Sequence, residues 1–124
     1  MKPVHFIGQC LKDLKKFPDE VRSEVGFALF LAQSGDKAIH AVPLVGFGSS
    51  KVLEVIIDHG SDTYRAVYTV KFPEAVYGLH AFQKKSKRGI ATPKSELDLI
   101  KQRLKLAELH YKTNYLAKKK DMAR

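Results

Sequence analysis

The middle of the chain reads Thr63-Tyr64-Arg65-Ala66-Val67-Tyr68-Thr69-Val70-Lys71-Phe72, and this stretch decides the fold. Successive side chains of a β-strand point to opposite faces of the sheet. One face of this strand would be aromatic and aliphatic, formed by Tyr64, Ala66, Tyr68, Val70 and Phe72. The other face would be mixed and would carry Arg65. The pattern predicts a strand with an arginine near its middle.

Two further apolar runs flank this strand at short distances along the chain. Val52–Ile57 precedes it across the polar turn 58–62, and Ala75–Gln83 follows it after a tight reversal at Pro73. Connections this short join antiparallel neighbours. We therefore expect a three-stranded meander in which Arg65 lies close to the end of the last strand.

Helical patterns precede the meander. Apolar residues recur at helical spacing from Ile7 to Phe17 and from Val21 to Ala32, which predicts two helices, the second ended by a glycine cap at Gly35. The second helix is apolar over much of its circumference, so either both sides pack or one side meets a partner. Before them, Val4–Ile7 predicts a strand. After them, the turn residues of Ala41–Ser50 predict a loop.

A last helix should begin at Thr92 as N-cap, with Pro93 at its first position. Its buried face would be apolar: Leu97, Ile100, Leu104 and Ala107. Lys101, Arg103 and Lys105 lie outside that stripe. We expect a single domain over 1–115 and a basic, disordered tail over 116–124. The predicted order, β-α-α-β-β-β-α, is that of an α+β fold, a twisted, mainly antiparallel sheet with helices packed on it.

Composition narrows the class of protein. The chain has 124 residues, of which 44% are hydrophobic, and this suits one small domain with a core. Cys10 is the only cysteine, which excludes a disulfide scaffold and a cysteine-based zinc site. No apolar run approaches the roughly 20 residues that span a bilayer. We expect a soluble, cytoplasmic protein that uses no cofactor.

The positive charge is concentrated in the last third of the chain. Residues 1–83 contain 9 basic and 9 acidic side chains, whereas residues 84–124 contain 13 and 4. We interpret Lys118-Lys119-Lys120 as part of a solvated tail. The cluster of Lys84, Lys85, Lys87 and Arg88 differs, because it comes where a strand ends and a helix is about to begin. Such a cluster predicts an anionic partner, for which nucleic-acid phosphates are the natural choice.

The mid-strand arginine admits two interpretations. A buried arginine needs a partner, and Glu54 on the neighbouring strand is the obvious one, so the pair would simply hold the sheet together. Alternatively, the guanidinium binds a phosphate with two parallel hydrogen bonds. The sequence leaves both interpretations of Arg65 open.

Alternation places His80, Phe82 and Lys84 on one face of the last strand. His80 is either a proton shuttle beside a phosphate site or a half-buried histidine bonded to backbone. Phe82 could stack on nucleic-acid bases, and Tyr64 and Tyr68 either do the same or belong to the sheet core. None of the five histidines has the helical spacing of a metal pair, so no metal site is expected.

Three segments together carry a family resemblance. They are Phe17-Pro18-Asp19-Glu20-Val21-Arg22, Thr63-Tyr64-Arg65-Ala66-Val67-Tyr68 and the run from Leu79-His80-Ala81-Phe82-Gln83-Lys84 to Thr92-Pro93. On these segments the chain resembles the RelE/HigB toxin superfamily, in its phage-derived, HigB-like branch. The resemblance spans roughly Phe6 to Leu109.

The resemblance implies the toxin of a type II toxin–antitoxin system, an endonuclease that cuts mRNA, typically on the ribosome. It also implies a helix-turn-helix antitoxin as partner. The phosphate-binding arginine would be Arg65, with contributions from Lys84 and Lys85 and further RNA contacts from Lys87 and Arg88. Cleavage without a metal proceeds by attack of the 2′-hydroxyl on its own phosphate, and Glu54 or His80 would be the base.

The chain also departs from its relatives. Glu54 stands near a position where some relatives carry lysines, and a long helix follows the sheet where several active relatives have a catalytic Tyr or His. The nearest tyrosines after the sheet, Tyr111 and Tyr115, are remote in sequence. Two alternatives therefore remain: a ParE-like toxin that is not a nuclease, and a non-catalytic relative that binds the antitoxin or RNA.

Overall fold

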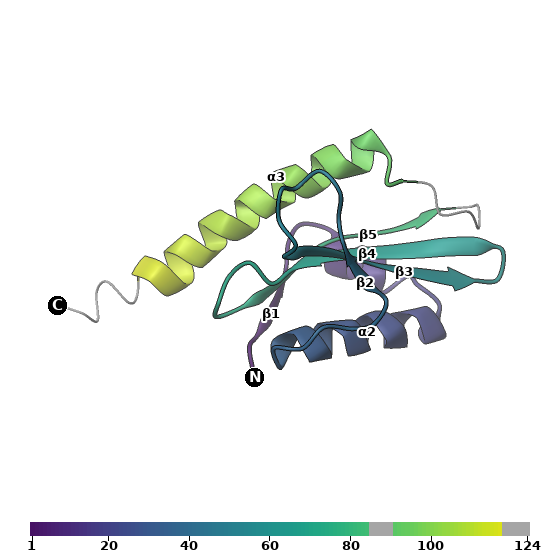
Figure 1. Ribbon diagram of the computed structural model, residues 1–124, viewed down its shortest axis with the longest axis horizontal. Helices are drawn as coiled ribbons and strands as arrows, with labels where there is room; N and C mark the ends of the chain where they lie inside the picture. The colour runs from purple at the N-terminus through teal and green to yellow at the C-terminus, as the bar shows by residue number, and fades with distance from the viewer. Residues whose placement is uncertain (85–90, 118–124) are drawn as a thin grey trace.

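The computed structural model describes residues 1–84 and 91–117 and is built on a five-stranded sheet in the order β1-β5-β4-β3-β2 (Figure 1). The predicted meander forms its centre, with β3 (Val52–His59), β4 (Asp62–Thr69) and β5 (Val76–Lys84) running antiparallel. The first strand, β1 (Val4–Phe6), pairs in parallel with β5. The predicted α+β class with a mainly antiparallel sheet is confirmed.

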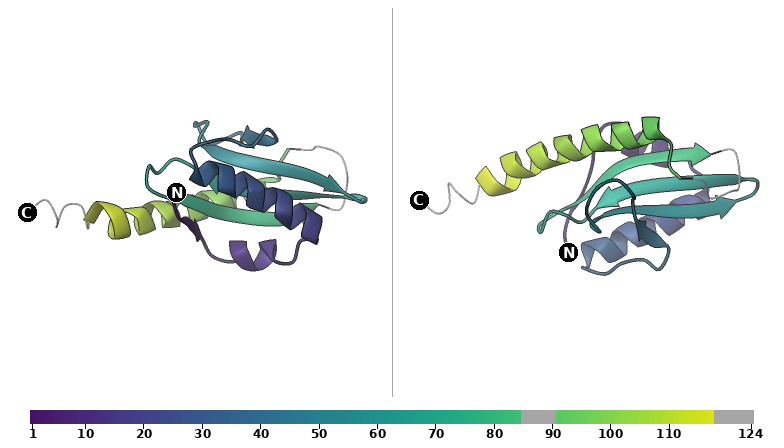
Figure 2. Two further views of the ribbon diagram at one scale, coloured as in Figure 1. Left: turned by 90° about the horizontal axis from the view of Figure 1, so that it is seen from below. Right: turned by 45° about the horizontal axis from the view of Figure 1, so that its top comes forward.

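Helices cover both faces of the sheet (Figures 1 and 2). On one side lie the short α1 (Cys10–Leu14) and α2 (Asp19–Gln33), which ends at a glycine with φ of 86°, as predicted. On the other side lies α3 (Lys94–Tyr111), continued by a π-helical turn over Lys112–Leu116. Each face has its own apolar core, because alternate side chains of the central strands point to opposite helices.

A short strand, β2 (Ala41–Pro43), lies in the stretch that we predicted to be a loop. It pairs antiparallel with β3 at the edge of the sheet. Three residues that include a proline carry too little strand signal to be recognised in sequence, and proline is tolerated at a sheet edge. The loop prediction was wrong for these residues.

The alternation expected for Thr63–Phe72 holds for the strand and for Val70 just after it, but not for Phe72. Tyr64, Ala66 and Tyr68 belong to the core under α2, as predicted. Phe72 instead belongs to the core under α3, where its ring lies 5.4 Å from that of Tyr77. The strand ends at Thr69, and beyond that point the chain turns, so the two-residue period no longer sets the direction of a side chain.

The beginning of α3 also differs from the prediction. The N-cap is Pro93 with ψ of 152°, the first helical residue is Lys94, and no side chain caps the helix start. Thr92 therefore lies outside the helix, and its hydroxyl bonds elsewhere. At the other end, the helix continues through Leu116, one residue into the stretch predicted as a tail, and residues 118–124 lie outside the described residues. The single domain over 1–115 stays a prediction.

Candidate functional site

Five of the predicted site residues lie on the sheet face that α3 partly covers. Residues paired directly across neighbouring strands point to the same face. Read across β3, β4 and β5, three successive rows are Glu54–Val67–His80, Ile56–Arg65–Phe82 and Asp58–Thr63–Lys84. The register therefore brings together Glu54, Arg65, His80, Phe82 and Lys84, as the alternation in β4 and β5 predicted.

The Arg65 guanidinium and the Glu54 carboxylate form a buried ion pair. Arg65 Nη1 lies 3.3 Å from Glu54 Oε1, and the two residues are 2% and 4% exposed. The Thr92 hydroxyl accepts a hydrogen bond from Arg65 Nη1 at 3.2 Å and donates one to Glu54 Oε2 at 2.7 Å. A buried ion pair persists only when hydrogen bonds complete it. Thr92 supplies two of these bonds from the segment just before α3.

This network lies at the wall of a cavity of about 280 Å³. Its polar lining is Glu54, Arg65 and Thr92. The remaining lining is apolar and comes from the β2 region, β3 and the start of α3: Val42, Pro43, Leu44, Val45, Ile56, Ala91 and Leu97. A carboxylate and a guanidinium on one small, mostly apolar cavity can accept a proton and stabilise a developing negative charge.

His80 belongs to a second network, which involves the α3 side chains Glu96 and Arg103. Its Nδ1 accepts a hydrogen bond from Arg103 Nη1 at 3.1 Å, and its Nε2 is bonded to the Glu96 carboxylate. Because arginine can only donate, Nδ1 is an acceptor and the ring proton lies on Nε2. Arg103 also donates to the Leu79 carbonyl at 3.0 Å. His80 is 5% exposed, so both ring nitrogens are committed inside the protein.

Glu96 and Arg103 are functional-site neighbours that sequence reasoning missed. Arg103 was predicted to lie outside the buried stripe of the last helix, yet it is 8% exposed. It stands three residues after buried Ile100 and seven after Glu96, so the helical period does place it on the same face. The positive charge of Arg103 was the reason to predict that it is exposed. Its hydrogen bonds to His80 and the Leu79 carbonyl make burial favourable.

His80 and the Arg65–Glu54 pair line different cavities. The one beside His80 measures about 310 Å³ and lies between β5, the α1–α2 region and the start of α3, with Lys16, Phe82 and Glu96 in its wall. The Phe82 ring stacks on His80 at a centroid distance of 5.0 Å. Of the two bases considered from sequence, Glu54 is therefore the one that shares a cavity with Arg65.

Residues 12–105 match the family model described as "Phage derived protein Gp49-like (DUF891)". The chain belongs to this Gp49-like family. No curated protein matches it. The solved structure of the isolated RelE toxin of E. coli is similar, with a TM-score of 0.51 over 82% of this chain and 98% of that one, at 16% sequence identity. The likeness shows that the Gp49-like chain has the RelE fold. The family match and this fold together confirm the resemblance to the RelE-like toxin superfamily seen in the sequence.

The basic cluster of this Gp49-like chain is described only in part. Lys84 is half-buried at the end of β5, opposite Thr63. Lys85, Lys87 and Arg88 lie outside the described residues. Their contributions to phosphate and RNA binding stay predictions.

Tyr64, predicted to stack on RNA bases, is not brought together with the other site residues. It points to the sheet face under α2 and is 8% exposed. Its ring packs edge-on against Phe17 at a centroid distance of 4.9 Å. This geometry fits the core role that the sequence left open, and we leave Tyr64 out of the proposed site.

Cys10 lies in the core, where burial above all raises the pKa of its thiol to about 12. Asp13 raises this pKa further, whereas the charge of Arg103 opposes the shift. Near neutral pH the sulfur is protonated and packs as a small apolar group.

Two absences concern the part of the chain that the structure describes, residues 1–84 and 91–117. In these residues His, Cys, Asp and Glu side chains do not gather in threes that would hold a metal ion. Among the same residues, α3 and the other helices do not combine the length and the apolar character required to cross a bilayer.

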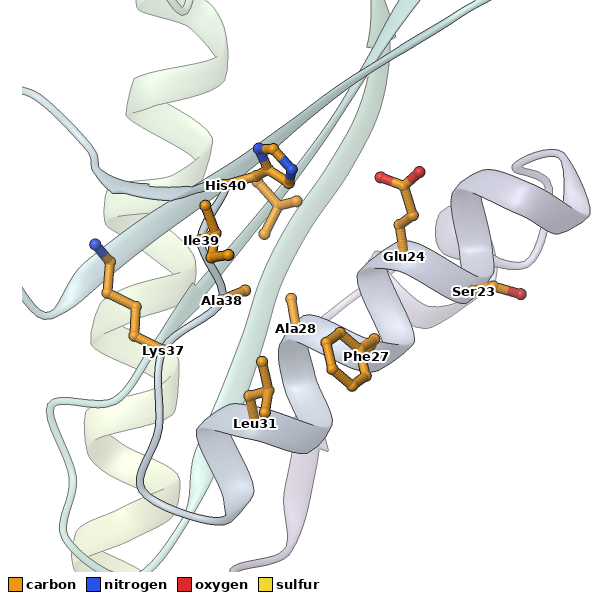
Figure 3. Close-up of a pocket in the computed structure, with 10 residues that line it drawn as sticks. Ser23, Glu24, Phe27, Ala28, Leu31, Lys37, Ala38, Ile39 and His40 are labelled. Atoms are coloured by element: carbon orange, nitrogen blue, oxygen red, sulfur yellow. The ribbon is translucent and has the colours of Figure 1, made fainter.

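An apolar groove of about 660 Å³ separates α2 from the segment before β2 (Figure 3). Phe27 and Leu31 form one wall and Ile39 the other, with Phe27 59% and Ile39 92% exposed. It lies on the α2 side of the sheet, away from the Arg65–Glu54 pair. Part of the apolar circumference of α2 is therefore exposed rather than packed.

Proposed function

We propose that this Gp49-like protein is a RelE-type toxin that cuts mRNA. The observation that carries the proposal is the Arg65–Glu54 pair, an ion pair of 3.3 Å whose two members line one cavity on the sheet face. The RelE fold and the family resemblance support the same reading. The reaction is proposed to need no metal and no cofactor.

In the proposed reaction, the 2′-oxygen of a ribose attacks the adjacent phosphorus and the bond to the 5′-oxygen breaks. The products are a 2′,3′-cyclic phosphate and a 5′-hydroxyl. Glu54 accepts the proton of the 2′-hydroxyl as general base and, once protonated, can return it to the leaving oxygen. Arg65 stabilises the charge that develops on the phosphorane, a contribution that can reach about 3 kcal/mol per donor.

His80 is proposed to orient the site rather than to act as its base. Its Nδ1 already accepts from Arg103, and it lines a different cavity from Arg65. Lys84 and, by prediction, Lys85 strengthen the positive potential beside Arg65. Lys87 and Arg88 are proposed to hold neighbouring phosphates, and Phe82 offers a ring face to a base.

The proposed partners are mRNA, as it is presented on the ribosome, and a helix-turn-helix antitoxin. The excess of positive charge after residue 83 suits the first, since Lys and Arg replace counterions on phosphates. The family resemblance suggests the second. A protein that cuts mRNA on ribosomes would act in the cytoplasm.

The test is inducible expression with transcript mapping. Wild-type protein is expected to stop growth and to yield mRNA fragments with 5′-hydroxyl ends. Arg65→Ala should restore growth and abolish the cuts. The matched control is Arg22→Ala, which removes an arginine of α2 whose contacts, with Asp19 and the Lys15 carbonyl, lie at the surface. If Arg65→Ala stays fully toxic, the assignment of the site is wrong.

One observation favours a second function, that of a non-catalytic RNA-binding relative. Arg65 is 2% exposed and already paired with a carboxylate, as in a purely structural ion pair. Such a protein would bind RNA without stopping growth. The same experiment also separates a ParE-like toxin, which would trigger a DNA-damage response and leave transcripts intact.

A further inference from the structure

The Thr92 hydroxyl occupies a position with an unusual pair of partners. It donates to Glu54 Oε2 at 2.7 Å and accepts from Arg65 Nη1 at 3.2 Å. Thr92 is 8% exposed, so these bonds are made inside the protein rather than at its surface. One aliphatic hydroxyl therefore bridges the proposed base and the proposed phosphate-stabilising group.

The start of α3 does not explain this arrangement. A threonine directly before a helix usually caps it by accepting from a backbone N–H. Here Pro93 is the N-cap, no side chain caps the helix, and the Thr92 hydroxyl turns to the cavity instead. Its partners are side chains of β3 and β4, so its role concerns the Arg65–Glu54 pair.

The chemistry of the hydroxyl suggests what it stands in for. The side chain of threonine ends in a secondary alcohol, as does the 2′ position of ribose. Proton transfer to Glu54 requires a hydroxyl that donates to its carboxylate, with Arg65 beside it to receive the phosphate. We infer that the Thr92 hydroxyl marks the subsite for the ribose 2′-hydroxyl and that RNA must displace it. This inference rests on the proposed function, since it uses the same pair.

The cavity around Thr92 is small. Its volume of about 280 Å³ lies just below the range of small-ligand pockets, which span about 300–1,000 Å³. Val42, Val45 and Leu97 give it apolar walls for a sugar or base. A deoxyribose in the same place would leave Glu54 Oε2 without the hydroxyl donor that Thr92 gives it, which is costly for a buried group. The subsite would thus select RNA over DNA.

The experiment removes the competing hydroxyl and measures binding of two nucleotides. Thr92→Val replaces the hydroxyl by a methyl group, which bonds to neither Glu54 nor Arg65 and is therefore not held in the place that the ribose hydroxyl needs. The probes are adenosine 3′-monophosphate and its 2′-deoxy counterpart, titrated by calorimetry. Thr92→Val is expected to bind the ribonucleotide on the order of tenfold more tightly than wild type, as for one hydrogen bond to a charged group. The deoxynucleotide should gain clearly less.

Two control variants accompany this measurement. Thr92→Ser retains a hydroxyl and should bring the ribose preference back towards that of wild type. Thr113→Val removes an exposed hydroxyl at the far end of the helix and should change neither affinity. If Thr92→Val does not fold, Thr92→Ala is measured in its place, since it also deletes the hydroxyl.

Equal gains for both nucleotides, or a loss for both, would overturn the inference. The outcome is independent of cleavage, because neither probe contains a bond to be cut. If wild-type protein cuts mRNA through Arg65 but Thr92→Val shows no ribose preference, the subsite is wrong and the proposed function stands. If the preference appears without cleavage, the subsite stands and the nuclease assignment is wrong.

Discussion

The two ends of the sheet face under α3 are built on different chemistry. Towards the start of α3, the contacts are charged: Arg65 with Glu54, and His80 between Glu96 and Arg103. Towards its end, the contacts are mainly aromatic, although the Tyr111 hydroxyl also donates to the Glu74 carboxylate at 3.2 Å. The Tyr77 hydroxyl bonds His110 Nδ1 at 2.7 Å, and the Tyr115 hydroxyl bonds His5 Nε2 at 2.7 Å. The ring centroids of Tyr111 and Phe72 lie 4.9 Å apart.

This difference distinguishes two parts of α3. The contacts near its end mainly stabilise the fold, whereas those near its start are suited to binding. Burial of aromatic rings stabilises a fold directly. A buried ion pair contributes little on balance, because the cost of desolvation offsets the attraction, and apolar residues of similar size often serve as well or better. The charged contacts near the start of α3 thus contribute little to stability on balance, and this favours a functional role for the Arg65–Glu54 pair.

The largest effect is expected when the Arg65–Glu54 pair is removed in two steps. Glu54→Leu alone should lower the free energy of unfolding by about 3–5 kcal/mol, because it leaves the Arg65 guanidinium buried without its carboxylate. Adding Arg65→Met should restore stability to the wild-type value or above, while RNA cleavage stays lost. Urea denaturation and transcript mapping give the two readouts. A double variant as unstable as the single one would mean that the pair is structural.

A second experiment concerns the charged contacts of His80. Arg103→Met keeps most of the aliphatic stem but removes the bonds to His80 Nδ1 and the Leu79 carbonyl. We expect a loss of about 1.5–3 kcal/mol in the free energy of unfolding, the range for a hydrogen bond to a charged group. Lys105→Met, an exposed site on the same helix, should change it by less than about 0.5 kcal/mol. Similar losses in both variants would show that the network contributes nothing specific.

At the aromatic end, single hydroxyls should matter less. Tyr77→Phe retains the buried ring and removes the bond to His110 Nδ1. The expected loss is about 1 kcal/mol, as for one neutral hydrogen bond. Chemical denaturation measures it, and cleavage activity should be unchanged, because this end carries none of the proposed chemistry. A large loss of activity in Tyr77→Phe would contradict the division of the face.

The smallest expected effect is a pH dependence of the aromatic end. Burial, and then the neighbouring His110, lower the pKa of His5 from its ordinary value of 6.5; Tyr77 and Tyr115 also face its ring. The unfolded chain therefore takes up this proton at a higher pH than the folded one. The stability that neutral His5 contributes is present above pH 6.5 and is lost as the pH falls from there towards the lowered pKa.

Melting temperatures at about pH 7.5 and about pH 5.5 measure this effect, and we expect a lower melting temperature at the lower pH, part of it attributable to His5. His5→Gln should reduce the fall. His40→Gln, at an exposed site beside the apolar groove, should leave it unchanged. An identical fall in wild type and His5→Gln would show that other groups cause the pH dependence.

Much of the fold was predictable because its signals are local. The alternation in β4 and the short turns predicted the meander, and the apolar spacing predicted the three main helices. What failed depended on distant partners. The edge strand β2 exists through its pairing with β3, and Arg103 is buried through His80 and the Leu79 carbonyl. The pairing of β2 leaves no periodic trace in the sequence, and the charge of Arg103 outweighed a helical period that does place it on the buried face.

The candidate site divides in the same way. The two-residue period of side chains along β5 placed His80, Phe82 and Lys84 on one face of the strand. The short turns brought that face next to Arg65. The tertiary structure decided that Glu54 shares a cavity with Arg65 while His80 lines another. One reason is that α3 crosses the sheet, so that its Glu96 and Arg103 side chains bond to His80. The other is that Thr92, which the sequence predicted to be a helix cap, bonds through its hydroxyl to the Arg65–Glu54 pair. The sequence by itself determined which residues share a face, since side-chain direction in a strand is local, but which of them share a cavity depends on how distant elements pack.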